Sequence, residues 1–155
     1  MMSRIADDLL AKIDKHGFTF IGVMSDGRQP GFTYSVGLTA IGMPELIMFA
    51  VPMHYAVQMM SELIEKHRQA GTVPMQTTRA EPLMDYSNLP GHLIIADPDR
   101  AERFTYQAKY YAEDLGLTPH YLQWVFPDRE GNFPWDEHWD TQFNRAQPLL
   151  GEMLK

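Results

Sequence analysis

Apolar residues recur at helical spacing in three segments of the chain. Near the amino end, Ile5, Leu9 and Ile13 are spaced to form one face of a helix, which Ser3 can cap. Two further segments combine an apolar stripe with charged residues outside it, and a glycine follows each of them. They predict helices over residues 53–70 and 100–115.

Strand patterns alternate with these helices. Residues 44–51 are almost continuously apolar and bounded by prolines, which predicts a strand buried on both faces near the centre of a sheet. Turn residues at 25–31 predict an antiparallel hairpin, and weakly patterned residues 72–90 could add a short edge strand. The remaining strands are predicted over residues 18–24, 32–38, 92–96 and 120–126. We therefore expect an α+β fold: a largely antiparallel sheet of about five to six strands, flanked by two to three helices.

Length and composition place the chain among ordinary globular proteins. Its 155 residues fit one domain, and no linker or composition shift divides them, so a single domain over residues 1–155 is predicted. The absence of cysteine excludes disulfides, thiolate metal sites and cysteine nucleophiles. The amino-terminal segment places acids among its apolar residues, and no apolar run approaches the roughly 20 residues that cross a bilayer. We expect a cytoplasmic protein that is not in a membrane.

The charge is acidic and unevenly distributed. The formal net charge is -7, and residues 113–140 carry seven acids against the single arginine Arg129. Because contacts to nucleic-acid phosphates need clustered lysine or arginine, we expect no nucleic acid among the partners.

Residues 121–135, YLQWVFPDREGNFPW, concentrate aromatic and hydrogen-bonding side chains. An aromatic run leads into turn-forming residues and then a second aromatic run, which predicts a hairpin or a tight corner. Indole rings supply stacking area and the polar side chains supply directional hydrogen bonds, a combination typical of small-molecule pockets. Alternatively, Trp124 belongs to the core and Asp128 with Asn132 only holds the turn. The candidate binding residues here are Trp124, Asp128, Arg129, Asn132 and Trp135.

The strand within residues 31–38 has one bulky and one nearly bare face. Because side chains alternate along a strand, Thr33, Ser35 and Gly37 share the bare face. Glycine in a strand often accompanies close approach of a ligand or of another backbone, although a helix packed there is the alternative. We predict a small-molecule pocket between this strand and residues 121–136. The strand's candidate binding residues are Thr33, Tyr34, Ser35 and Gly37.

A hydrolase or transferase is a second hypothesis. A carboxylate near aromatic surface can acquire a raised pKa suited to proton transfer, so Asp128 or Asp136 could act as a base beside His120 or His138. The six histidines show no HExxH pattern, so no metal site is predicted. The alternative is a site assembled from distant residues: His92, His120 and a carboxylate of Asp136 or Glu137. Nucleophile-elbow, P-loop and Rossmann motifs are absent, so the cofactor is unknown.

A protein interaction module is the third hypothesis. Tyr106 and Tyr110 are four residues apart and share one stripe of a predicted helix. Together with the tryptophan-rich corner, this stripe could form an aromatic interface, including one between copies of the chain in a homo-oligomer.

Four segments resemble a known family when they are taken in order: PGFTYSVGL, PELIMFAVP, WVFPDREGNFPWD and QPLLG. Together they are similar to the bacterial domain-of-unknown-function family numbered 4262. The similarity runs from about residue 17 to residue 151, and PDREGNFPWD is its most specific part. The resemblance implies a small stand-alone bacterial domain and carries no catalytic residues with it.

Overall fold

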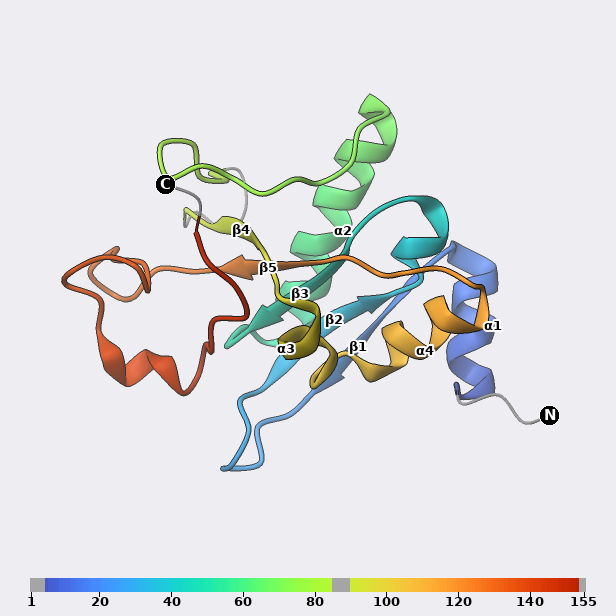
Figure 1. Cartoon of the computed structure of the whole chain (residues 1–155), viewed down its shortest axis with the longest axis horizontal. Coiled ribbons are helices and arrows are strands. Elements are labelled where there is room, and N and C mark those ends of the chain that lie inside the picture. Colours follow the sequence, from blue (N-terminus) through green and yellow to red (C-terminus); the bar gives the residue numbers. More distant parts are fainter. Residues whose placement is uncertain (1–4, 85–89, 154–155) are drawn as a thin grey trace.

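The computed structural model describes residues 5–84 and 90–153. Its centre is a five-stranded sheet in the order β1-β2-β3-β5-β4 (Figure 1). All neighbouring strands are antiparallel except β3 and β5, which run parallel. The α+β class and the mostly antiparallel sheet are confirmed, but the described residues form five strands and not six. These are β1 (Thr19–Val23), β2 (Phe32–Val36), β3 (Glu45–Phe49), β4 (His92–Ile95) and β5 (Tyr121–Val125).

The described residues form four α-helices around the sheet, where two to three were predicted: α1 (Asp7–His16), α2 (Met53–Ala70), α3 (Pro98–Glu102) and α4 (Tyr106–Asp114). The single helix expected over residues 100–115 is wrong, because it breaks between α3 and α4. At the break, Phe104 packs edge-on against the rings of Phe32 and Phe49, with centroids 5.2 and 5.1 Å away. The next residue, Thr105, donates its hydroxyl to the Ala101 carbonyl at 2.9 Å, a bond that bends helices.

The ends of the first two helices follow their sequence signals. Gly17 follows the last residue of α1 and adopts a φ of 89°, and Gly71 follows the last residue of α2 with a φ of 69°. Both glycines occupy the left-handed conformation that favours glycine after a helix. The amino end of α1 differs from the prediction: the helix starts at Asp7, and Ser3 lies outside the described residues.

The described residues form two large hydrophobic clusters on opposite faces of the sheet, and a smaller third cluster around Ile94, Val125, Phe133 and Met153. On one face, α2 buries Met60 and Leu63 against Met48 and Trp124. On the other face, α1, α3 and α4 pack against side chains of β2 and β3. Every residue of β3 is buried, which confirms the prediction of a central strand covered on both faces.

The segment after β5 forms a corner, and the alternative of a hairpin is wrong. Both edges of β5 are already paired, with β3 and with β4, so a following strand has no free edge to join. The chain then curls through residues 126–140 and passes a short 3-10 helix, η2 (Thr141–Asn144). Its end returns to the sheet, where Gly151 bridges Ala96 in antiparallel fashion.

Two smaller features complete the described part. The second strand ends at Val36, two residues before its predicted end, and a 3-10 helix, η1 (Leu38–Ile41), begins at Leu38. Within residues 72–84 and 90–91 no edge strand forms beyond one bridge between Leu83 and Gly91. None of the helices in the described segments is long and apolar enough to cross a bilayer.

Candidate functional site

Several connections meet at one edge of the sheet, the edge formed by the ends of the strands and not by an outer strand. Strands β3 and β5 are parallel and so end at the same edge, where the antiparallel β2 begins. Residues 50 and 51, which follow β3, lie beside the β1–β2 connection in one direction and beside the chain that follows β5 in the other. Figure 1 shows where these connections leave the sheet. Loops held by a rigid sheet commonly carry binding sites. Two clefts open at this edge.

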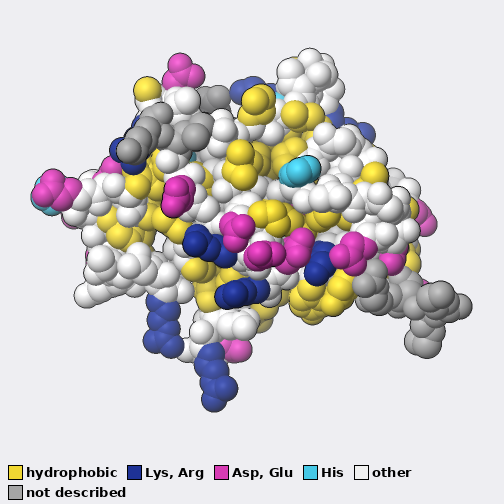
Figure 2. Space-filling view, viewed as in Figure 1, with side chains coloured by type: hydrophobic (Ala, Val, Ile, Leu, Met, Phe, Trp, Pro, Cys, Tyr) yellow, Lys and Arg dark blue, Asp and Glu magenta, His cyan; other side chains and the backbone are white. Residues whose placement is uncertain are grey.

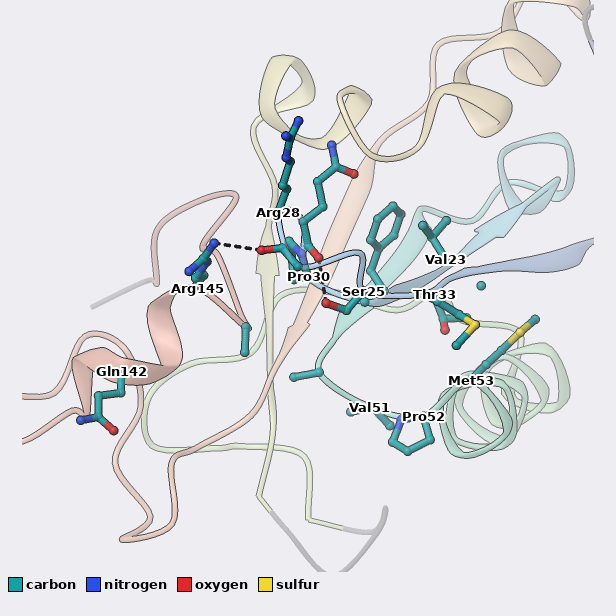
Figure 3. Close-up of a pocket in the computed structure, with 18 residues that line it drawn as sticks. Val23, Ser25, Arg28, Pro30, Thr33, Val51, Pro52, Met53, Gln142 and Arg145 are labelled. Atoms are coloured by element: carbon teal, nitrogen blue, oxygen red, sulfur yellow. Dashed lines mark hydrogen bonds between the residues drawn. The ribbon is translucent and has the colours of Figure 1, made fainter.

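The first cleft has a volume of about 700 Å³. Its walls are residues 22–25, 27–33 and 50–53, together with Gln142, Arg145 and Ala146 next to η2. In Figure 3 the side chains of Arg28 and Arg145 lie on the side of the cleft opposite Met53. Segments from both ends of the sequence thus form one concave surface.

The β1–β2 connection is shaped by its own side chains. The Asp26 carboxylate accepts hydrogen bonds from the amides of Arg28 at 2.8 Å and Gln29 at 2.7 Å. These bonds, that from Gln29 first, hold the pKa of Asp26 below its ordinary value. The Ser25 hydroxyl donates to the Gln29 carbonyl at 3.0 Å and closes the turn (Figure 3). The Asp26 carboxylate therefore serves the backbone of the turn, while the Arg28 side chain lines the cleft.

Arg145 ties the carboxyl-terminal segment to this turn. One of its terminal nitrogens donates to the Gly27 carbonyl at 3.0 Å, across 118 residues of sequence (Figure 3). Within the described part of the chain, neither Arg145 nor Arg28 belongs to an ion pair. The remaining donors of both guanidinium groups can therefore point to a ligand.

The charge in the first cleft is opposite to that of the whole chain. Two arginines line it, and none of its lining residues is acidic, whereas the chain carries a net charge of -7. Figure 2 shows basic side chains projecting at the lower edge of the molecule, while acidic side chains gather nearer the middle of the same face. The cleft is thus a local cationic site on an acidic protein.

Ala50 stands between the two clefts in a strained conformation. Its φ is 62°, and it is the single non-glycine residue with a positive φ among those described. The Ala50 amide donates to the Gly31 carbonyl at 3.2 Å, which holds the residue at the end of β3. A non-glycine residue in this region costs about 1–2 kcal/mol, and such strain concentrates at functional sites.

The second cleft has a volume of about 610 Å³ and lies on the other side of Ala50. Its walls come from the ends of β3 and β5, the exposed face of α2 and the residues around η2. Glu62 is the one charged residue among them. The lining residues are Phe49, Ala50, Val51, Tyr55, Gln58, Met59, Glu62, Phe126, Pro127, Trp139, Phe143 and Gln147.

Asp128 organises the corner that supports this second cleft. One carboxylate oxygen accepts from the amides of Glu130 and Asn132, each at 2.9 Å, and the other accepts from the Asp140 amide at 2.9 Å. Burial opposes ionisation, but these backbone hydrogen bonds outweigh it and lower the pKa of Asp128. Asp128 therefore holds the corner, as the structural alternative in the sequence analysis proposed.

The nine predicted binding residues are not gathered in either of the two clefts. Thr33 lines the first cleft, and the other eight line neither cleft. Thr33 and Trp124 lie in one row across the sheet, with Met48 of β3 between them. Helix α2 packs on this face and buries Trp124, which agrees with the alternative of a helix on the bare side of the strand.

The other strand residues of the predicted set serve the interior. The Ser35 hydroxyl donates to the Glu45 carboxylate at 2.7 Å and accepts from the Leu46 amide at 2.8 Å. Tyr34 is buried in the cluster on the opposite face. A Cβ at Gly37 would lie 3.0 Å from the Gly17 carbonyl oxygen, so the small residue here allows another backbone to approach.

The remaining predicted residues lie on the corner. Arg129 is exposed and Asn132 is half-buried. Trp135 stacks on Phe133 with ring centroids 5.2 Å apart, and both rings pack edge-on against His92. Ligand binding by these eight residues remains a prediction.

The arrangement gives little support to the proposed acid–base pair. Both Asp128 oxygens accept backbone hydrogen bonds, and the Asp136 carboxylate accepts from the Phe133 amide at 2.7 Å. His120 and His138 are exposed. Within residues 5–84 and 90–153, no group of three or more histidines and carboxylates is placed to hold a metal ion.

His92 differs from the other histidines because it is buried. Its Nδ1 shares a 2.7 Å hydrogen bond with the Thr77 hydroxyl, which also accepts from the Leu93 amide at 3.1 Å. Burial lowers the pKa of His92, although the nearby Asp136 opposes that shift. This buried histidine fits a role in packing residues 72–84 against the corner.

The cleft arginines were missed by the sequence analysis. Arg28 was assigned only to a turn, and Arg145 lies in a tail with no recognised motif. One signal was available: Arg145 is the only lysine or arginine within residues 130–153. Its partner in the cleft is 117 positions away, so their proximity could not be derived from spacing.

The fold and the clefts define an α+β domain with helices on both faces of a mixed sheet and a cationic cleft at one edge. The chain belongs to the family described as Domain of unknown function (DUF4262), whose model matches residues 12–140. The comparison with curated proteins found no significant match. The comparison with solved structures likewise found none.

Proposed function

We propose that this protein binds a small anionic molecule in the first cleft. The observation that carries the proposal is the pair Arg28 and Arg145, which line a cleft without acidic residues on a protein of net charge -7. The volume of about 700 Å³ lies within the range of roughly 300–1,000 Å³ that is typical of small-molecule sites. The walls of this cleft include residues 31–33, at the beginning of the predicted 31–38 strand.

Arginine suits this role better than a general positive charge would. Its planar guanidinium offers paired donors that match a carboxylate or a phosphate group. Arg145 is oriented by its bond to the Gly27 carbonyl, so part of the entropic cost of ordering the side chain is already met before a ligand arrives. Acidic residues elsewhere on the surface matter less, because charges more than about 8 Å apart are screened at physiological salt.

The strain at Ala50 is the second support. Ala50 is exposed, lines both clefts and adopts the left-handed conformation. Only its small methyl side chain stands where the two clefts meet. Backbone strain of this kind persists where a function requires the geometry. We place the ligand's acidic group between Ala50 and the two arginines. Because the protein is expected in the cytoplasm, the ligand would be a cytoplasmic molecule.

Isothermal titration with inorganic phosphate, methyl phosphate and citrate tests the proposal. We expect at least one of them to bind the wild type, and R28Q and R145Q each to weaken that binding about tenfold, as the loss of one charge-assisted hydrogen bond predicts. R68Q is the matched control, since Arg68 is an exposed arginine in the last turn of α2.

Two results would overturn the proposal. One is that none of these anions binds the wild type. The other is that R28Q and R145Q bind as the wild type does, or that R68Q weakens binding as much as they do, because the anion would then respond to overall charge.

A further inference from the structure

We infer that the ligand is an amphiphile, whose acidic group lies in the first cleft and whose apolar body lies in the second. The inference rests on the proposed function for the position of the acidic group. It adds the chemical class of the rest of the molecule and a second set of contacts.

The two clefts adjoin each other. Ala50 and Val51 line both of them. The chain around η2 also contributes to both, because Arg145 faces the first cleft while Phe143 and Trp139 face the second. A molecule held at Arg145 therefore has the second cleft directly within its reach.

The second cleft offers apolar contact, because several of its polar groups are already bonded within the protein. The Gln147 side chain accepts from the Phe126 amide and donates to the Phe126 carbonyl, both at 2.9 Å. The Trp139 indole nitrogen donates to the Asn144 side chain at 2.7 Å. What remains for a ligand is largely the faces of aromatic rings and aliphatic side chains.

Exposed and half-buried side chains at this cleft provide apolar contact area for a ligand. Tyr55 is 55% exposed on the outer face of α2, and Val51, Phe126 and Phe143 are half-buried. The rings of Trp139 and Phe143 lie 6.0 Å apart at an angle of 49°. An alkyl chain or a ring system placed here would bury these surfaces.

Charge fixes the orientation of the ligand. Glu62 lines the second cleft and Arg28 and Arg145 line the first. An acidic group would be repelled at the glutamate and attracted at the arginines, so the two ends of the molecule cannot exchange places. The polarity of the paired clefts thus matches one acidic end and one apolar end.

Monoalkyl phosphates of increasing length test the inference: methyl, butyl and octyl phosphate, titrated below their micelle concentrations. Binding to the wild type should tighten about two- to fourfold for each added methylene that becomes buried. Y55S should reduce this dependence on chain length, so that its affinity falls most for octyl phosphate and least for methyl phosphate. R145Q should weaken all three probes by a similar factor.

Y106S is the matched control, because Tyr106 is 52% exposed on α4 and Tyr55 is 55% exposed on α2. It should leave all affinities unchanged. Since both tyrosines are exposed, neither variant is expected to prevent folding, and circular dichroism of each variant checks this.

The outcomes separate this inference from the proposed function. If methyl phosphate binds through the arginines and chain length has no effect, the inference is overturned and the proposed function stands. If chain length matters equally in wild type and Y55S, the apolar body lies elsewhere and the inference is again overturned. If none of inorganic phosphate, methyl phosphate and citrate binds the wild type, the cationic site fails and both the proposed function and this inference fall.

Discussion

Replacing Gly151 with alanine tests how firmly the carboxyl-terminal segment is held against the sheet. A Cβ at this position would overlap the Ile95 carbonyl oxygen and would lie 3.0 Å from the Ile95 carbonyl carbon and 3.3 Å from the Ala96 Cα. All three are backbone atoms, so no side-chain rotation can relieve the overlap. The backbone bridge between Gly151 and Ala96 must open.

The cost follows from what this opening disturbs. The Leu150 carbonyl accepts from the Asp97 amide at 2.6 Å, and the Leu150 side chain is 2% exposed in the core. Overpacked sites commonly cost about 1–3 kcal/mol, and a clash between backbones belongs at the upper end. We expect G151A to lower the free energy of unfolding by about 3 kcal/mol, or the melting temperature by about 6–12 °C for a chain of this size.

Urea unfolding followed by tryptophan fluorescence measures this change. G22A is the matched control, because its new Cβ would meet the side chain of Met53, which is 47% exposed and can rotate away. The control should stay within about 1 kcal/mol of the wild type. A loss below 1 kcal/mol in G151A would refute the packing of the tail described above, and with it the position of Arg145.

Three further predictions concern buried or strained groups. Burial raises the pKa of Glu45 above its usual 4.5, although Thr39, Ser35 and Leu38 donate hydrogen bonds to its carboxylate. As pH rises above 4.5, Glu45 therefore loses its proton first in the unfolded chain, and urea unfolding should show that the wild type loses stability relative to E45Q. A wild type that gains stability relative to E45Q over this pH range would contradict the prediction. The pKa of Asp128 is lowered from 3.8, so its ionised form stabilises the fold above that pH; D128A should melt earlier at pH 7, and equal melting curves for the two proteins at pH 7 would count against the corner. Replacing Ala50 with glycine removes the strain of a φ of 62° and should raise the free energy of unfolding by about 0.5–1 kcal/mol in the same assay; a decrease would mean that the conformation is not strained.

The spacing of apolar residues in the sequence was sufficient to predict the elements whose buried side chains follow a regular pattern along the chain. Helix α2 begins and ends where the apolar stripe and Gly71 indicate, and β3 is the buried central strand that its continuous apolar run predicts. Helix α4 was joined to α3 in the prediction, because the turn of Phe104 into the core depends on Phe32 and Phe49 from distant strands. Tertiary packing decided that boundary.

The site was harder to predict because it is assembled from distant segments. The parallel pairing of β3 with β5 joins residues more than 70 positions apart, and it decides which loops share an edge. The aromatic corner attracted the prediction because its residues are rich in binding chemistry, but Asp128 uses that chemistry to hold the loop. The arginines of the first cleft carry no local motif and meet through the bond from Arg145 to the Gly27 carbonyl.

Anion binding in the first cleft can be followed residue by residue from amide chemical shifts during titration with butyl phosphate. We predict that the amides of Gly27, Arg28, Ala50 and Arg145 shift together and saturate with one dissociation constant, while those of Gly131 and Asn132 on the corner do not move. Shifts confined to the corner, or shifts spread evenly over the surface without saturation, would contradict the claim that this protein binds anions in its cationic edge cleft.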